Sequence, residues 1–341
     1  MSKMVLNGLF PAGTRVVSLP SKKTPRLFLM GDTPLKRWRE SSLYPAYRSS
    51  AKGYRFLLRL KAFSGIGAHS LEHLNDWLIG EFARDIFPKI SSLVVLLGTA
   101  GPTQKLIIQI WDDMNVIGYL KLAQTQAARI RLEREYVMLT ALPKGVGPRV
   151  LRFGEMETGK ALLMTPVAGK PLSIGLPPLE VVWDFVQSLE TSETFSGDSH
   201  PWIQRLRLFN SASVDLWVDQ LSRHRWPLAY QHGDLAPWNL FATRKDKLVA
   251  VDWEYGTVQG FPYVDIIQYC LQVAFLIHRL PPKKAKTLVM RLLAHRVNRF
   301  AQHEIEALVN LSVLSTFRQA EQDGHSQYTH QQIWRREVWM S

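Results

Sequence analysis

The hydrophobic pattern of the chain changes near residue 93, and this change constrains its fold more than any other feature. Three short apolar runs follow one another there, separated by turn-forming residues: LVVLL at 93–97, KLIIQIW at 105–111 and VIGYLKLA at 116–123. Such runs predict three consecutive β-strands. A helical pattern then extends over 124–142, and two further strands are expected at 149–154 and 161–165. The sequence therefore predicts a small antiparallel sheet with one helix inserted after its third strand.

The part of the chain before this sheet follows less regular patterns. Residues 1–40 contain scattered Pro, Gly, Ser, Lys and Arg without a sustained period, which predicts mostly irregular structure. A helix is expected at 44–63, where an aromatic and apolar stripe lies beside a basic stripe. A second helix is expected from Ser70, which is a suitable N-cap, to Phe87.

The part of the chain after the sheet is mainly helical. Beyond Pro171 helical patterns dominate, and only the segment 230–260 interrupts them. A chain of 341 residues is long enough to bury the cores of two lobes. The sequence thus predicts an α+β fold in three parts: a basic N-terminal extension at 1–62, a sheet-containing lobe at 63–168 and a helical lobe at 169–341.

The segment 230–254 contains the residue types that metal-dependent chemistry needs. It reads YQHGDLAPWNLFATRKDKLVAVDWE, so Asp234 and Asn239 lie five positions apart in a loop, and Asp252 lies 18 positions beyond Asp234. Between Asn239 and Asp252, two short apolar runs flank TRKDK, a pattern that indicates a hairpin. A hairpin would return Asp252 to the neighbourhood of Asn239. Two carboxylates and one amide oxygen would then converge on one point.

Oxygen ligands of this kind suit a hard cation such as Mg²⁺, which also binds the phosphates of a substrate. Phosphoryl transfer uses the cation to neutralise the terminal phosphates, and a carboxylate to orient the attacking hydroxyl and accept its proton. The spacing from His232 to Asp252 matches the H-x-D-x-x-x-x-N loop of kinases and the metal-binding Asp that follows it. A single H-x-D with a downstream Asn would indicate only turn chemistry, whereas the complete constellation is far more specific.

HGDLAPWN followed by VDWE resembles the aminoglycoside phosphotransferase and choline kinase group of the protein-kinase-like fold. The resemblance implies two lobes, a small antiparallel-sheet N-lobe and a mainly helical C-lobe, to which this chain adds its N-terminal extension. It implies that Asp234 is the catalytic base and that Asn239 and Asp252 bind Mg²⁺. It also implies that His232 braces the loop and that Asp265, in GFPYVDI, supports it.

A kinase of this fold requires a lysine on its third strand and a glutamate on the following helix. Lys121 is the only basic residue of its strand, although an isolated strand lysine is usually a solvated edge charge. Of two candidate glutamates, Glu135 shares the apolar stripe of the helix with Met138, whereas Glu133 has a weaker apolar register. A buried glutamate needs a cation, so Glu135 is the predicted partner of Lys121.

The loop at 98–104 (GTAGPTQ) follows the first of the three strands, where a kinase covers the phosphates of its nucleotide. Gly98, Thr99 and Gly101 are therefore predicted nucleotide contacts. The loop has only two glycines and no G-x-G-x-x-G, and Pro102 lacks an N–H donor. By itself this pattern is that of an ordinary hairpin turn.

The segment 162–172 (LLMTPVAGKPL) resembles the connection between the two lobes, whose backbone meets the adenine edge. Because Pro166 has no N–H, a neighbour such as Val167 or Ala168 must supply the donor. Thr165 and Val167 are the predicted nucleotide contacts of this segment. ATP or GTP, together with Mg²⁺, are the expected cofactors.

The net charge of +13 is concentrated in one region. Residues 1–61 contain 13 Lys and Arg but only two acids, whereas 62–169 and 170–341 each carry a net charge of +1. The basic stripe at 48–59 has three interpretations: a solvated helix face, attachment of 44–63 to an anionic membrane surface, or nucleic-acid binding. Nucleic acid is the least favoured partner, because the charge lies outside any recognised module.

The motif does not choose the small-molecule acceptor, because one fold serves many substrates. The resembled group phosphorylates aminoglycosides, choline, sugars and other small hydroxyl compounds. A polycationic aminoglycoside requires an acidic face, which the nearly neutral segment 170–341 does not predict. This segment is rich in Trp and Arg, which suit a sugar ring and an anionic group. A sugar, sugar phosphate or lipid-linked saccharide is therefore the predicted acceptor.

Two other functions compete with a small-molecule kinase. A protein kinase is disfavoured because the chain has no APE-like segment and has DWE in place of DFG. The alternative is an inactive kinase-fold scaffold that binds a membrane or a partner through the basic N-terminal segment. It is disfavoured because the chain retains the complete set of Asp234, Asn239, Asp252 and Lys121.

Cysteine usage and hydropathy bear on location. The single cysteine, Cys270, fits a reducing compartment, and no apolar stretch approaches the roughly 18 residues of a membrane span. The expected location is the cytoplasm, at the periphery of a membrane if the basic stripe binds lipid.

Overall fold

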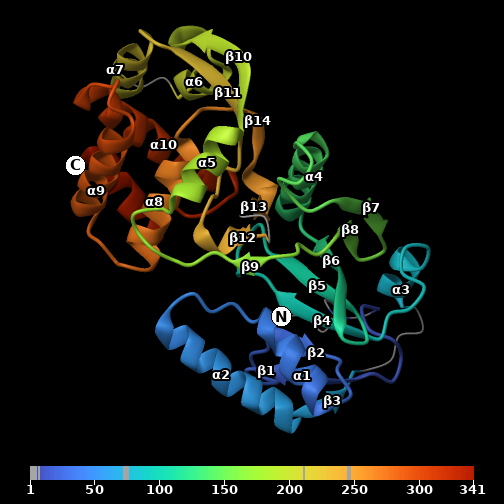
Figure 1. Cartoon of the computed structure of the whole chain (residues 1–341). Coiled ribbons are helices and arrows are strands. Elements are labelled where there is room, and N and C mark those ends of the chain that lie inside the picture. Colours follow the sequence, from blue (N-terminus) through green and yellow to red (C-terminus); the bar gives the residue numbers. More distant parts are fainter. Residues whose placement is uncertain (1–5, 7, 72–76, 210–211, 244–246) are drawn as a thin grey trace. The chain divides into compact units, whose positions relative to one another are not determined.

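The computed structural model of the chain describes residues 6, 8–71, 77–209, 212–243 and 247–341 (Figure 1). The chain forms two compact units. The first contains Met1–Tyr136 and Pro148–Pro166, and the second contains Val137–Gly147 and Val167–Ser341. The chain therefore passes into the second unit between Pro166 and Val167, within the segment predicted to join the lobes.

The first unit is built on one antiparallel sheet with the strand order β3-β1-β2-β4-β5-β6-β8-β7. Its strands are β1 (Arg15–Leu19), β2 (Leu27–Leu29), β3 (Ala68–Ser70), β4 (Ser92–Leu97), β5 (Lys105–Asp112), β6 (Asn115–Ala123), β7 (Val150–Met156) and β8 (Gly159–Met164). Its helices are α1 (Pro34–Glu40), the 3₁₀ helix η2 (Ser41–Leu43), α2 (Ser49–Ser64), α3 (Leu78–Ala83) and the first part of α4 (Gln126–Ala141). The five predicted strands and the helices predicted at 44–63 and 124–142 are confirmed.

The prediction of mostly irregular structure for residues 1–40 missed three elements. This segment contains β1, β2 and α1, and the two strands belong to the same sheet as β4. The strands are short, and β2 pairs with β4 far along the sequence. β1 and β2 also pair with each other, but they join the rest of the sheet through the contact of β2 with β4, which a local pattern does not show. Residues 1–62, predicted as a separate extension, thus contribute strands to the sheet and helices that pack on it.

The helix predicted from Ser70 to Phe87 was also wrong in its extent. Ser70 ends strand β3, which pairs with β1, and the helix observed is α3 alone (Leu78–Ala83). Part of the predicted helix, residues 72–76, lies outside the described residues. Sheet pairing of residues 68–70 with β1 replaces the helix cap that Ser70 suggested.

Strand β4 is buried on both faces, which explains its uninterrupted apolar sequence. Leu93, Val95 and Leu97 point into one core, which α3 covers through Ile79. The alternate residues Val94 and Leu96 point into a second core, which α2 covers through Leu58 and Ala62. The period of two along the strand therefore divides the first unit into two cores, one on each face of the sheet.

The second unit is mainly helical. Its helices are the end of α4, α5 (Glu180–Ser188), η3 (Gly197–Ser199), α6 (Pro201–Arg207), α7 (Ala212–Leu221), η4 (Pro237–Asn239), η5 (Trp253–Tyr255), α8 (Val264–Leu276), α9 (Pro282–Arg296), α10 (Gln302–Gln322) and α11 (His330–Met340). Two three-stranded sheets accompany them, β10-β11-β14 (Glu190–Ser196, Arg225–Gln231, Thr257–Gly260) and β13-β12-β9 (Leu248–Ala250, Leu240–Ala242, Lys170–Pro171). Strand β10 was not predicted, because its sequence ETSETFS is polar without alternation.

The predicted fold class is confirmed. The N-terminal unit is an antiparallel sheet flanked by helices, and the C-terminal unit is mainly helical, with α8, α9, α10 and α11 packed together (Figure 1). Among the described residues, no helix combines the length and apolar character that crossing a bilayer requires.

Candidate active site

The loop after β11 carries the candidate catalytic residues, and the predicted hairpin is present. Strands β12 and β13 pair antiparallel, with Leu240 opposite Ala250. One residue further, the Val251 N–H donates to the Asn239 carbonyl at 2.9 Å. The pairing therefore places Asp252 next to Asn239, as predicted. Part of the intervening turn, residues 244–246, lies outside the described residues.

Asp234, Asn239 and Asp252 converge. The Asn239 side chain donates from Nδ2 to the Asp234 carbonyl oxygen at 3.0 Å, so its amide oxygen is the atom suited to bind a cation. Burial, and after it the negative charge of Asp252, raise the pKa of Asp234, so the charge of Asp252 acts on the Asp234 carboxylate. Two like charges at one point repel each other unless a cation or a proton intervenes. This donor set fits Mg²⁺, which accepts one or two carboxylates and leaves positions for phosphate oxygens.

The carboxyl group of Asp234 has an unusual pKa. Burial among protein atoms, and secondarily the charge of Asp252, raise the pKa of Asp234 to about 7, although part of the residue remains accessible to solvent. Gln272 of α8 donates from Nε2 to Asp234 Oδ1 at 2.6 Å and fixes the carboxylate in place. A carboxylate with a pKa close to neutrality is suited to accept a proton during a reaction.

Asp265, at the start of α8, supports the loop after β11 through hydrogen bonds. It is 3% exposed, and its carboxylate accepts hydrogen bonds from the N–H groups of His232 at 2.6 Å and Gly233 at 2.9 Å. Burial nevertheless raises the pKa of Asp265 to about 6. Gly233 has φ +77°, and a Cβ there would lie 2.4 Å from the Tyr255 carbonyl oxygen, so only glycine fits between His232 and Asp234.

Replacing Asp265 with Ala is expected to lower the free energy of unfolding by about 2–4 kcal/mol, because two buried backbone N–H groups lose their acceptor. Urea denaturation of the purified protein measures this loss. Asp265→Asn is the matched control, since its one amide oxygen retains part of the bonding and should cost less. An Asp265→Ala variant as stable as the wild type would show that Asp265 does not support the loop.

His232 and Trp253 anchor the position of Asp252. His232 Nε2 lies 2.9 Å from the Val251 carbonyl oxygen, and its ring lies 4.6 Å from that of Trp253. Trp253 is fully buried and donates from Nε1 to the Ala250 carbonyl oxygen at 2.9 Å. Asp252 itself adopts a left-handed conformation, with φ 71° and ψ 53°. Such backbone is unfavourable for most residues and tolerable for Asp, so the anchors on both sides hold a strained position.

In the first unit, Lys121 of β6 and Glu135 of α4 form a buried ion pair. Lys121 Nζ lies 2.6 Å from Glu135 Oε1 and 2.7 Å from Oε2, and the two residues are 7% and 0% exposed. The competing candidate, Glu133, contacts Lys160 instead. The predicted pairing is therefore present, while the contact of Lys121 with a nucleotide stays a prediction.

The predicted phosphate loop is a short connection between β4 and β5. The Gly98 N–H donates to the Lys105 carbonyl at 2.9 Å, and Gln104 Nε2 donates back to the Gly98 carbonyl at 2.8 Å. Thr99 and Gly101 lie exposed at its tip. These bonds close the turn at its base and leave the tip accessible, which is compatible with the predicted role of the loop without establishing it.

The two predicted hinge residues fall in different units. Thr165 closes the end of β8: its N–H donates to the Arg149 carbonyl at 2.9 Å, and its Oγ1 accepts from the Arg149 N–H at 3.0 Å. Val167 is half-buried at the start of the second unit. The hydroxyl of Thr165 thus has a structural partner, and the nucleotide contacts of both residues stay predictions.

Two residues that the sequence did not indicate lie beside Asp234. Gln272 bonds it directly, and the positive charge of Arg335 on α11 lowers the pKa of Asp234. Burial in turn lowers the pKa of Arg335 to about 10. Both side chains come from helices distant in sequence, and a polar residue on a helix carries no local signal of what it faces.

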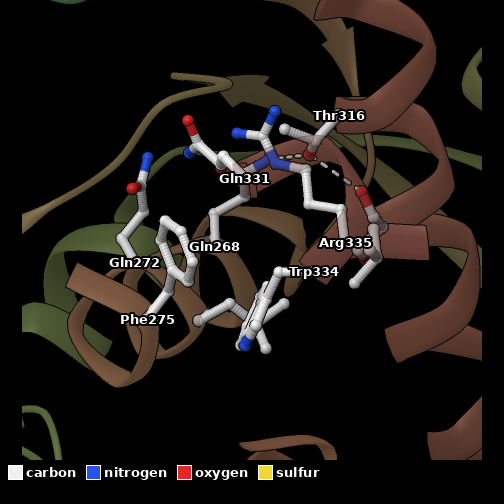
Figure 2. Close-up of a pocket in the computed structure, with 10 residues that line it drawn as sticks. Gln268, Gln272, Phe275, Thr316, Gln331, Trp334 and Arg335 are labelled. Atoms are coloured by element: carbon white, nitrogen blue, oxygen red, sulfur yellow. Dashed lines mark hydrogen bonds between the residues drawn. The ribbon is translucent and has the colours of Figure 1, made fainter. Parts of the chain in front are cut away.

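Gln272 and Arg335 also line a pocket between α8, α10 and α11, with about 380 Å³ of empty space including its open mouth. Its other lining residues are Gln268, Leu271, Phe275, Ser312, Val313, Thr316, Gln331 and Trp334. Figure 2 shows the polar ends of Gln272 and Arg335 on one side of the pocket and the rings of Phe275 and Trp334 on the other. A pocket with aromatic walls and a few polar groups, next to a carboxylate with a raised pKa, is the usual form of a substrate site.

Several solved structures are similar to this chain, each with a TM-score below 0.5. They include a choline kinase from Streptococcus pneumoniae (15% identity, TM-score 0.47, covering 77% of this chain and 96% of that one). They also include an ethanolamine kinase from Plasmodium vivax (14%, TM-score 0.44, 77% and 85%) and a type I macrolide 2′-phosphotransferase (12%, TM-score 0.43, 73% and 92%). No family model and no curated protein matches the sequence. These three neighbours are thus two small-molecule kinases and a phosphotransferase, at 12–15% sequence identity.

Proposed function

We propose that the chain is a Mg²⁺-dependent kinase that transfers the terminal phosphate of ATP or GTP to a hydroxyl group of a small molecule. The observation that carries this proposal is the convergence of Asp234, Asn239 and Asp252 beside a pocket. A dedicated hairpin, a strained Asp252 and a buried Asp265 all maintain this convergence.

Each residue then has one chemical task. Asp234 accepts the proton of the acceptor hydroxyl, and the bond from Gln272 keeps its carboxylate oriented. Asn239 and Asp252 hold Mg²⁺, which when bound neutralises the charge of the phosphates. Lys121, kept in position by Glu135, binds the nucleotide phosphates.

The pocket favours a saccharide acceptor. Phe275 and Trp334 offer apolar ring faces, and Gln272 and Arg335 offer planar polar groups that match hydroxyl and acidic substituents. No lining residue is Asp or Glu within the described chain, and the charge of Arg335 opposes a cation. The expected substrates are therefore neutral or anionic sugars, and choline or an aminoglycoside should be poor acceptors.

A transfer assay with labelled ATP and GTP tests this function. Incubation with Mg²⁺ and a panel of sugars, sugar phosphates, choline and aminoglycosides should label sugars preferentially, and Asp252→Ala should abolish the labelling. A substantial rate on the cationic acceptors would overturn the acceptor class. If no acceptor in the panel is labelled, and Mg²⁺ with nucleotide produces no shift in melting temperature, the chain is an inactive scaffold.

Replacing Arg335 with Gln is expected to raise the KM for an anionic sugar roughly 10-fold, because a charge-assisted contact is lost. The same change removes a charge that lowers the pKa of Asp234, so the rise of kcat/KM with pH should move to higher pH. The adjacent Arg336→Gln is the matched control, since Arg336 does not line the pocket. Equal effects of both substitutions would remove Arg335 from the acceptor site.

A further inference from the structure

Helix α2 has a second apolar face that its own unit does not cover. Its inner face buries Leu58 and Ala62, which are 5% and 0% exposed. Its opposite side exposes four large apolar side chains, here called the outer face: Phe56 (53%), Leu57 (62%), Leu60 (46%) and Phe63 (48%). Spacings of three and four residues place these side chains on one stripe of the helix. The helix lies along the edge of the first unit with α1 beside it (Figure 1).

The orientation of the outer face is fixed by contacts with α1. Arg37 donates from Nε to the Ala62 carbonyl at 2.8 Å and from Nη2 to the Phe63 carbonyl at 3.2 Å. Arg59 donates from Nε to the Trp38 carbonyl at 3.2 Å, and its guanidinium lies 4.1 Å from the centre of the Trp38 ring. These bonds, together with the buried inner face, prevent the helix from rotating its exposed leucines into the core.

Aromatic contacts hold the outer face in a fixed conformation. The ring of Trp38 meets the rings of Phe56 at 5.9 Å and Phe63 at 6.4 Å, both edge-on. The two phenylalanines are thus held in place while about half of their surface stays exposed. Contiguous exposed apolar side chains on a rigid scaffold mark a surface that binds another protein or a membrane.

The charge around the outer face indicates what kind of surface it binds. Helix α2 carries Lys52, Arg55, Arg59 and Lys61 and no acidic residue. The two acids among residues 1–61 do not offset this charge. Glu40 is buried and accepts from the Gly31 N–H at 2.9 Å, and Asp32 pairs with Lys36 at 3.4 Å. An apolar stripe flanked by Lys and Arg is complementary to a layer that has an apolar interior and anionic groups at its surface.

We propose that the outer face of α2 inserts into the interface of an anionic lipid membrane, with the basic residues of the helix at the level of the headgroups. A helix that lies in the membrane plane uses this combination of Phe and Leu beside Lys and Arg. A second copy of the chain is a poorer occupant, because a symmetric contact through α2 would bring its four cations against four cations. Nucleic acid is also a poorer occupant, because its phosphates could contact the basic residues but it has no apolar layer in which the leucines of the outer face could be buried. The proposal goes beyond the kinase function and does not depend on it.

Vesicle flotation of the full chain tests the proposal. Vesicles of phosphatidylcholine with about 30% phosphatidylserine should bind it at least about 10-fold more tightly than phosphatidylcholine alone, and about 0.5 M salt should weaken the binding. Leu57→Ser with Leu60→Ser should lower the binding at least about 10-fold. The matched control is Leu208→Ser with Leu216→Ser, two leucines that are 81% and 59% exposed elsewhere on the chain. This control should bind like the wild type.

A thiol label shows whether the outer face enters the lipid. Cys270, the only native cysteine, is buried, so a fluorophore attached to Leu57→Cys reports on one position. Its emission should shift to shorter wavelength with anionic vesicles, whereas the same label on Leu216→Cys should not respond. Failure to bind anionic vesicles at low salt, or equal binding by the Leu57→Ser and Leu60→Ser variant, would overturn the proposal. A third result would also overturn it: the wild type forms a dimer, this variant does not, and neither protein binds vesicles. The outer face would then be a contact between two copies of the chain.

Discussion

Replacing Asp234 with Asn is expected to reduce phosphate transfer about 10²–10⁴-fold and, at the same time, to stabilise the metal-free protein. Activity falls because an amide cannot accept the proton of the acceptor hydroxyl. Stability rises because the substitution removes one of two neighbouring carboxylates from a buried position. Nucleotide binding should remain, since Asn239 and Asp252 are unchanged.

The pH dependence of this gain in stability follows from the direction in which folding shifts the pKa of Asp234. The pKa of Asp234 is about 7 in the folded protein, against 3.8 for an ordinary Asp, so the folded state binds the proton more tightly. The cost of ionising Asp234 is therefore absent below pH 4, grows as the pH rises and is complete above pH 7. The Asn variant should exceed the wild type by roughly 1–3 kcal/mol at a pH of about 8, and the difference should shrink on acidification.

Urea denaturation of both proteins in the presence of a chelator, at several pH values, measures the difference. Asp215→Asn is a suitable control, because Asp215 is an exposed residue in the first turn of α7. It should not change activity and should lower stability by no more than about 1 kcal/mol at any pH. Two results would contradict the assignment: turnover preserved in Asp234→Asn, or a variant less stable than the wild type at every pH.

The second large effect is expected at the buried ion pair of the first unit. Glu135→Ala removes the carboxylate that pairs with the buried ammonium group of Lys121 and should lower the free energy of unfolding by about 3–5 kcal/mol. Nucleotide binding should be lost as well, since Lys121 is no longer held in position. Glu133→Ala, which removes a partly exposed contact with Lys160, should cost less than about 1 kcal/mol and leave nucleotide binding intact.

A double variant separates the structural role of the pair from its functional role. Lys121→Met with Glu135→Leu replaces the ions with apolar side chains of similar size, so much of the lost stability should return. Nucleotide-dependent shifts in melting temperature should stay absent, because the ammonium group of Lys121 no longer contacts the phosphates. A double variant that still binds nucleotide like the wild type would show that Lys121 serves the fold alone.

The sequence predicted those parts of the fold that local patterns specify. Strands β4, β5 and β6 are apolar runs separated by turns, and α4 follows directly, so neighbours in sequence are neighbours in space. The hairpin of β12 and β13 is equally local, which is why the approach of Asp252 to Asn239 could be predicted. The choice of Glu135 over Glu133 followed from the helical period alone.

The errors lie where pairing is non-local. β2 is only three residues long, and its neighbour β4 stands far along the chain. β10 is polar except for Phe195 and exists as a strand because it pairs with β11. No window of sequence contains both members of these pairs, so their patterns resembled loop or helix.

The sequence by itself determined the chemistry of the site, because Asp234, Asn239 and Asp252 lie within one loop and one hairpin. Only the tertiary structure decided what surrounds that chemistry. Helix packing brings Gln272 and Arg335 to one pocket, and docking of α2 through Leu58 selects which of its apolar faces remains exposed. The physical reason is that hydrogen-bonded hairpins are specified by neighbouring residues, whereas the side of a helix that becomes buried depends on a surface that a distant part of the chain provides.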